Sequence, residues 1–179
     1  MKIESLQAEE AAVLAAAQAM CAAARTAPKA CGVDTLDTAI LTGEDKDALS
    51  AEMRRIAEID GDAFFIRDAE NVDKSQVVVL IGADDKPRGV DRVCSLCGWD
   101  GCGDCVKNHG KCIMNSVDLG IAVGSAVSLA ADLRMDNRIM FTAGKAASAL
   151  GLLGDKKLIF GIPLSVSGKS PYFDRKFNR

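Results

Sequence analysis

The sequence predicts a single α+β domain that spans residues 1–179. Segments that favour helices alternate with segments that favour strands, and no internal repeat, low-complexity run or interdomain linker interrupts them. With 49% hydrophobic and 26% charged residues, the composition is that of a globular protein. A chain of 179 residues is also long enough to fold without disulfide cross-links. Because aromatic residues make up only 4%, we expect a core of closely packed small side chains.

The first part of the chain contains two helix signals around one strand. Alanine, the strongest helix former, occupies 12 of the 23 positions from 8 to 30, which predicts a helix over residues 6–24. Residues 36–41 have the length and the turn boundaries of a strand. Residues 45–59 return to helical apolar spacing, and Gly61 is expected to end that helix.

The middle of the chain is expected to hold the central strand. Residues 63–66 are a short apolar run, and residues 68–75 favour a polar helical turn or a loop. Residues 77–81 are rich in β-branched side chains and predict a strand that is buried on both faces. Residues 83–92 turn polar and predict a loop that leads into a cysteine-rich segment.

The last third is expected to add two helices and one strand. Residues 115–133 are apolar on nearly every side and include several small residues, which predicts a buried helix that its neighbours approach closely. A helix over 143–153 and a strand over 157–162 follow. The tail is polar, and we expect its aromatic pair Tyr172 and Phe173 to pack on the body.

Charge and hydropathy disfavour several classes of partner. The net charge is −3 and no long basic block is present, which argues against nucleic acid and anionic membranes. The longest uncharged runs, 11–24 and 119–131, fall short of the ~20 residues that cross a bilayer. Glu4, Glu9 and Glu10 precede the first apolar stretch, where an export signal has a basic start, so we expect no export signal.

The cysteines are distributed unlike those of a secreted disulfide framework. Their number, seven, is odd, and five crowd into residues 94–112 while Cys21 and Cys31 stand alone. We therefore expect a reducing cytoplasm, with Cys21 and Cys31 as small buried side chains.

The cysteine-rich loop 94–112 is the most informative segment. Its five thiols are interleaved with glycines, which allow the chain to turn so that side chains converge on one point. Trp99 is its single large apolar group, so the loop cannot hold itself together by burial. Thiolates are soft ligands that select zinc or iron–sulfur clusters. The thiols in order are Cys94, Cys97, Cys102, Cys105 and Cys112.

Three interpretations of this loop remain open. An iron–sulfur cluster uses four cysteines at short early spacings with one later ligand. Structural zinc also uses paired Cys-x2-Cys units, but it usually separates the pairs by a dozen residues or more, and here only four intervene. The third interpretation is that the thiols hold no metal. His109 lies within the segment and is a further candidate ligand, although a solvated histidine is common in such loops.

The run from Cys94 to Cys102, followed by Cys112, resembles the Cys-x2-Cys-Gly-aromatic-x2-Cys four-iron module of corrinoid iron–sulfur proteins and of Rnf-type electron-transport subunits. The flanking segments 24–29, 65–71, 118–126, 138–145 and 161–169 are similar to an uncharacterised bacterial and archaeal family described as containing a ferredoxin domain. The resemblance implies a [4Fe–4S] cluster on Cys94, Cys97, Cys102 and Cys112. The last interval is shorter than in the corrinoid-type proteins, so Cys105 is the alternative fourth ligand.

The order of elements also resembles the nitroreductase-like fold, a small mixed or antiparallel sheet surrounded by helices. Members of that fold are usually dimers that hold FMN at their interface. The resemblance implies that Arg25, Thr26 and Lys29 lie near a flavin phosphate, where cations suit an anion. The alternative is that Arg25 and Lys29 only complement the dipole at the end of the first helix.

These observations favour a redox function over hydrolysis. We expect one [4Fe–4S] cluster that relays electrons to or from a redox partner protein or a small-molecule carrier, and bound FMN would make the protein an oxidoreductase. The alternative is a non-catalytic structural or interaction protein closed by zinc. A single histidine excludes a multi-histidine zinc centre. The small-residue helix from Asp118 predicts a homodimer.

Overall fold

A computed structural model describes residues 1–173 of the chain. These residues form a mixed succession of helices and strands, with two short 3₁₀ turns. The elements in chain order are α1 (Ser5–Thr26), η1 (Ala30–Gly32), β1 (Leu36–Leu41), α2 (Gly43–Asp60), α3 (Ala63–Asp73), β2 (Val77–Ala83), η2 (Asp91–Val93), α4 (Cys102–Lys107), α5 (Ile113–Asp132), β3 (Asp136–Asn137), α6 (Phe141–Ala149) and β4 (Leu158–Ser165). The helices α3 and α4 and the strand β3 were not predicted.

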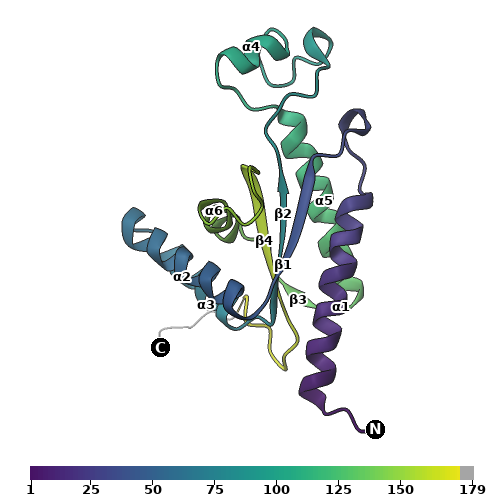
Figure 1. Ribbon diagram of the computed structural model, residues 1–179, viewed down its shortest axis with the longest axis vertical. Helices are drawn as coiled ribbons and strands as arrows, with labels where there is room; N and C mark the ends of the chain where they lie inside the picture. Colours follow the sequence, from purple (N-terminus) through teal and green to yellow (C-terminus); the bar gives the residue numbers. More distant parts are fainter. Residues whose placement is uncertain (174–179) are drawn as a thin grey trace.

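The four strands form one antiparallel sheet in the order β1-β2-β4-β3. Helices cover both faces, with α1 and α5 on one side and α2, α3 and α6 on the other (Figure 1). Strand β2 is central and buried at every position. Its side chains alternate between the faces, so that Val77, Val79 and Ile81 pack under α1 and α5 while Val78 and Leu80 pack under the other three helices. The predicted α+β fold with an antiparallel sheet is therefore confirmed.

Small side chains let the helices approach each other closely. Helices α1 and α5 pack through alanines such as Ala17 and Ala126, both with no exposed surface. The two helices also share a polar contact, because the hydroxyl of Ser125 donates to the carbonyl of Ala23 at 3.0 Å. The core of small residues expected from the composition is therefore present.

Helix α6 lies directly on the backbone of β4. A Cβ atom added at Gly144 would lie 1.7 Å from the carbonyl oxygen of Ile159, and one added at Gly161 would lie 2.6 Å from the Cβ of Ala143. Both distances are shorter than the separation that two non-bonded heavy atoms can adopt. Glycine at these two positions is what permits the contact between helix and strand.

Residues 63–73 depart from the sequence-based expectation. They form the single helix α3 rather than an apolar run followed by a polar turn. Phe65 is buried as expected, but so is the polar side chain of Asp68. The hydroxyl of Thr142 on α6 donates to one oxygen of Asp68 at 2.8 Å and Arg67 donates to the other at 2.9 Å, so both oxygens of the buried carboxylate have a partner.

Smaller differences lie in the last third. Helix α6 ends at Ala149, four residues earlier than predicted, and Gly151 adopts a left-handed φ of 67° just beyond it. The two-residue strand β3 was not predicted. In the tail, Tyr172 is buried with its hydroxyl 2.9 Å from that of Ser75, whereas Phe173 is exposed, contrary to expectation.

Of the helices described, α5 alone is long and apolar enough to cross a membrane by length and composition. It is longer than the uncharged run in the sequence because it includes Asp118. A core helix of a soluble protein passes the same test, and α5 packs one face against α1 and the sheet.

Candidate metal centre

The cysteine-rich loop connects two elements that are fixed in the core. The connection leaves β2 after Ala83, continues into the cysteine-rich loop 94–112 and ends at Cys112, the residue that caps the start of α5. The loop and its short helix α4 stand at one end of the molecule, beyond the sheet (Figure 1). Because both ends of the loop continue into buried elements, the packing of β2 and α5 determines where the cysteines lie.

The loop reverses direction through residues with positive φ. Glycine occupies two such positions at no steric cost, Gly98 with φ 80° and Gly101 with φ 91°. Asp91, Ser95 and His109 adopt the same left-handed region at 58°, 43° and 54°, which is uncommon for residues that carry a Cβ. Repeated reversals within a short segment return its side chains to a common centre.

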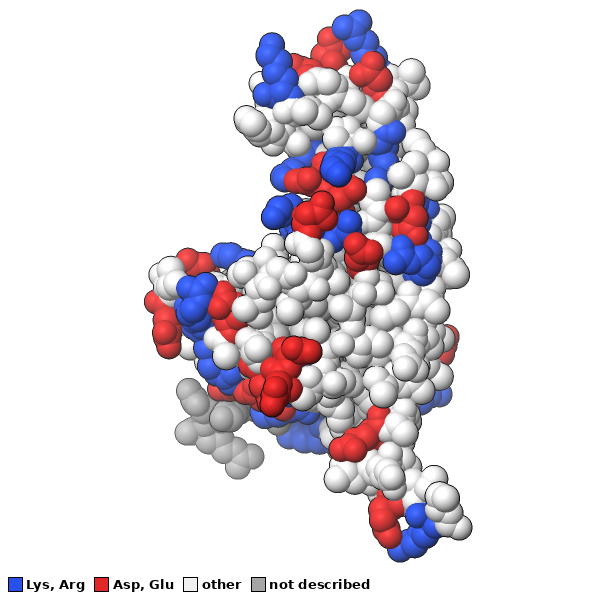
Figure 2. All heavy atoms as spheres, viewed as in Figure 1, with Lys and Arg blue, Asp and Glu red and all other residues white. Residues whose placement is uncertain are grey.

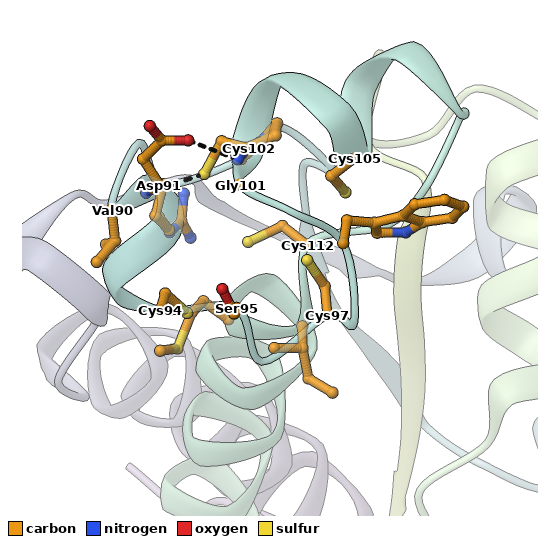
Figure 3. A pocket seen from close by; sticks show the side chains of 14 residues that line it. Val90, Asp91, Cys94, Ser95, Cys97, Gly101, Cys102, Cys105 and Cys112 are labelled. Atoms are coloured by element: carbon orange, nitrogen blue, oxygen red, sulfur yellow. Dashed lines mark hydrogen bonds between the residues drawn. The ribbon is translucent and has the colours of Figure 1, made fainter.

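Asp91 joins the first turn of the loop to α4. The backbone N–H of Cys102 donates to the Asp91 carboxylate at 2.9 Å, and the backbone N–H of Asp91 donates to the sulfur of Cys102 at 3.3 Å (Figure 3). A Cβ at Gly101 would lie 2.4 Å from the same carboxylate, so only glycine fits there. The two contacts hold Cys102 and the first turn of the loop together.

Trp99 covers the other side of the loop. A Cβ at Gly110 would lie 2.4 Å from the indole nitrogen of Trp99 and 2.9 Å from the sulfur of Cys105. The N–H of Gly110 also donates to the carbonyl of Cys105 at 2.8 Å. The glycine therefore allows the indole ring, the end of the loop and α4 to pack closely.

All five cysteines of the loop line one small cavity of about 20 Å³. They come from the turns that follow η2, from α4 and from the start of α5, and apolar side chains such as Val90 and Ile113 complete the wall. Figure 3 shows the sulfur atoms of Cys97, Cys102, Cys105 and Cys112 turned toward the same space. Cys105 and Cys112 are buried, and the other three thiols are half-buried. The thiols predicted from the sequence pattern thus lie together.

The thiols disfavour one another as anions. Burial raises the pKa of Cys105, and the nearby sulfur atoms of Cys97, Cys112 and Cys102 raise it further. A positively charged centre among them would offset this repulsion. A single tetrahedral zinc ion, with Zn–S distances of ~2.3 Å, would need its four sulfurs about 3.8 Å apart. Within residues 1–173, no three cysteine, histidine, aspartate or glutamate side chains are grouped to hold one metal ion.

A buried polar network lies at the base of the loop. The guanidinium Nη2 of Arg88 donates to the carboxylate of Asp118 at 2.8 Å, and both side chains are only 3% exposed. The same nitrogen donates to the hydroxyl of Thr35 at 2.8 Å, and the other oxygen of Asp118 accepts the N–H of Ala30 at 2.9 Å. Asn115, one turn earlier on α5, donates to the carbonyl of Lys86 at 2.8 Å. The network therefore joins the loop to η1, β1 and α5.

Sequence reasoning did not identify this network. Arg88 was assigned only to a polar loop, and Asp118 only to the start of a helix. One signal was available, because Asn115 and Asp118 are polar residues at helical spacing in an otherwise apolar helix. Their partners could not be found from the sequence, since they lie far away along the chain.

Arg25, Thr26 and Lys29 lie together at the end of α1, where each already has partners within the chain. Arg25 donates to Asp34 and to the carbonyl of Leu36, both at 2.6 Å, and holds the pKa of Asp34 below its usual value in spite of partial burial. Thr26 and Lys29 donate to backbone carbonyls of the last helical turn. These contacts are those expected of residues at a helix C-terminus, and all three side chains have partners within the chain.

The remaining candidates lie outside the cavity. His109 is exposed and does not line it. Cys21 is half-buried and Cys31 is exposed with a φ of 58°, so the expectation that both are buried is wrong for Cys31.

Acidic and basic side chains are interspersed around the cysteine loop. Arg92 lies 3.6 Å from Asp100, and Lys111 pairs with Asp85, whose pKa this ammonium holds below its usual value. Figure 2 shows blue and red residues mixed at this end of the molecule, without a broad patch of one sign on the face in view. The face in view therefore shows no extended basic site for a polyanion beside the candidate centre.

Two sequence comparisons place the chain among known proteins. A family model described as "Uncharacterized protein containing a ferredoxin domain" matches residues 108–175, a range that includes Cys112 but not the four earlier cysteines of the loop. An uncharacterised protein of Archaeoglobus fulgidus is 46% identical over 169 residues, which cover 89% of this chain and 90% of that protein.

Solved structures with the same fold include proteins named as nitroreductases and one named as an NADPH:FMN oxidoreductase. Nitroreductase CinD from Lactococcus lactis, in complex with nicotinic acid, has a TM-score of 0.58 at 17% identity. The match covers 93% of this chain and 84% of the CinD chain. The NADPH:FMN oxidoreductase from Vibrio harveyi has a TM-score of 0.54 at 13% identity over 90% of this chain. The chain spans only 63% of that enzyme and 58% of the hypothetical oxidoreductase YcnD from Bacillus subtilis. At these identities the likeness concerns the fold alone.

Proposed function

Because the chain belongs to the family of uncharacterised proteins containing a ferredoxin domain, we propose that it is a redox protein that carries one [4Fe–4S] cluster on loop 94–112. The observation that carries the proposal is the convergence of five thiols on one cavity in a loop with few other means of holding its shape. Thiolate sulfur is the ligand that such clusters require. The cluster, when bound, supplies a one-electron donor and acceptor.

The proposed ligands are Cys94, Cys97, Cys102 and Cys112, with Cys105 as the alternative fourth ligand. Cys112 is held by the start of a core helix, and Cys102 receives the N–H of Asp91. Cys94 and Cys97 are half-buried on turns of the loop, and Cys102 is half-buried at the start of α4, so the core does not enclose these three thiols. The apolar wall would exclude water and so help to set the reduction potential.

A cofactor inventory of anaerobically purified protein tests this proposal. We expect about four iron atoms and four acid-labile sulfides per chain, with visible absorbance that dithionite bleaches. The same sample should contain no stoichiometric zinc. One zinc per chain without acid-labile sulfide would instead support the structural, non-catalytic alternative and overturn the redox proposal.

Bound FMN is a second candidate, and the fold supports it, because solved structures of this fold include an enzyme named for FMN. Arg25, Thr26 and Lys29 remain the proposed phosphate site, although Arg25 would have to exchange Asp34 for the phosphate. With FMN present, the protein would be an oxidoreductase that receives electrons from a partner protein or a small-molecule carrier. Flavin fluorescence measured on the denatured sample of the same inventory decides whether FMN is present.

We also propose that the protein is a cytoplasmic homodimer formed through α5. All seven cysteines are unpaired, as a reducing compartment requires. The outward face of α5 carries no charge between Ile113 and Ala131, and a Cβ at Gly120 or Gly124 would meet nothing within 4 Å. This face also borders a hollow of about 810 Å³ beside α6 and β4. An uncharged helix face that allows close backbone approach suits a second copy of the same helix.

The Ile121→Glu variant is expected to be monomeric. Ile121 is 42% exposed on the outward face of α5, so a glutamate there leaves the core intact but places a charge in the proposed interface. Light scattering after gel filtration should give twice the chain mass of 18.8 kDa for the unmodified protein and about that mass for the variant. Ile59→Glu, at a 68% exposed position on α2, is the control and should remain dimeric. A monomeric unmodified protein would refute this proposal.

A further inference from the structure

Arg88 is placed where its charge would act on the candidate centre. Its side chain is 3% exposed and lines the same cavity as the five cysteines. Asp118, its ion-pair partner, does not line that cavity. The positive member of a buried ion pair therefore borders the cavity, and the negative member lies behind it on α5.

The guanidinium group of Arg88 cannot leave this position without loss of several contacts. Its Nη2 is held by both Asp118 and Thr35 at 2.8 Å. Asp118 is fixed in turn by its place in the core helix and by the N–H of Ala30. Breaking a buried pair by removing one partner costs ~3–5 kcal/mol, so the charge is held firmly.

One donor of Arg88 has no partner within the chain. The Nε atom is buried and makes no hydrogen bond, and a buried donor without an acceptor costs about 1–3 kcal/mol. The five cysteines line the same cavity as Arg88, and their sulfur atoms can accept a hydrogen bond. Hydrogen bonds to the sulfurs of an iron–sulfur cluster are among the features that set its potential.

We propose that Arg88 raises the reduction potential of the cluster, through its buried positive charge and through an Nε–H donor available to a cluster or cysteine sulfur, and that Asp118 positions it. This inference rests on the proposed iron–sulfur function. Reduction adds one electron and hence one negative charge to the cluster. A fixed cation in a medium of low dielectric stabilises the reduced form more than the oxidised form. The carboxylate of Asp118 opposes this effect but lies farther from the cavity.

Potentiometric titration with dithionite and redox mediators, followed by electron paramagnetic resonance, tests the inference on cluster-loaded protein. Arg88→Met removes the charge and the donor, and we expect a more negative potential than in the unmodified protein. Arg88→Lys keeps the charge but loses the Nε donor, and its potential should lie between the two. Asp118→Asn removes the opposing charge, and its potential should become more positive.

Arg92→Met is the matched control. Arg92 lies on the same loop, but its side chain is 76% exposed, so water and salt screen its charge and the potential should hardly change. If Arg88→Met does not fold, Asp118→Asn still tests the inference, because its reduction potential is expected to shift in the opposite direction, to a more positive value. Iron and sulfide content, measured on every sample, keep the two proposals apart. Unmodified protein without a cluster would overturn the proposed function, whereas loaded variants that all share one potential would overturn only the role of Arg88.

Discussion

The Cys97→Ser variant is expected to purify without iron or acid-labile sulfide, whereas Cys105→Ser retains both. Cys97 is the only thiol on the tight turn between Ser95 and Gly98, two residues with left-handed φ, so its loss removes the ligand from that corner of the cavity. Cys105 is the thiol whose pKa burial and its neighbours raise. Cys105 is also the thiol that the four-iron module leaves unmatched, so the cluster is expected to form without it.

Iron and sulfide analysis of both variants after anaerobic purification measures the outcome, with dithionite-bleachable absorbance as a second readout. Circular dichroism of the same samples shows whether the body has folded, because α1, α5 and the sheet do not depend on the loop for their core. Full iron content in Cys97→Ser would contradict the proposed ligand set. Loss of iron from Cys105→Ser would instead assign Cys105 as the fourth ligand in place of Cys112.

The Gly144→Ala variant should be strongly destabilised. In an ordinary helix this change stabilises by up to about 1 kcal/mol, because alanine is the better helix former. Here the new Cβ would lie 1.7 Å from the carbonyl oxygen of Ile159 and 2.5 Å from its carbonyl carbon. Both are backbone atoms of a strand in the middle of the sheet, so α6 must move away and lose its packing. Overpacking of this kind costs ~3 kcal/mol.

Thermal unfolding should show this loss as a decrease in Tm of roughly 10 °C for a chain of this length. Gly168→Ala provides the comparison, since its Cβ would meet nothing within 4 Å and its φ is not positive. That control should unfold within a degree or two of the unmodified protein. An equal Tm for Gly144→Ala would show that α6 does not rest on β4 as described.

The local signals in the sequence were sufficient for most of the fold. The alanine-rich segment and the β-branched run gave α1 and β2 almost to the residue, because helix and strand preferences act between near neighbours. Residues 63–75 were the main failure. Their polar members looked like a turn, but Asp68 is buried in a helix, where Thr142, 74 residues later, donates to one oxygen of its carboxylate.

For the candidate centre, too, some features could be predicted from local sequence and others could not. Spacing and glycine content alone indicated that the five thiols of loop 94–112 converge, because both are local properties of a short segment. The binding partners of Arg25 and Lys29 could not be derived from the sequence. Only the structure shows that Arg25 is bound to Asp34 and the carbonyl of Leu36, and that Lys29 is bound to the end of its own helix.

The sequence by itself determined the main helices and strands, the chemistry of the thiol ligands and the small-residue character of the core. These follow from residue type and short-range spacing. The tertiary structure alone decided that Arg88 borders the cysteine cavity with Asp118 behind it, that β2 is covered on both faces by different helices, and that α6 needs a glycine against β4. Each of these depends on contacts between residues far apart in the chain, and such contacts exist only after the sheet and helices have packed.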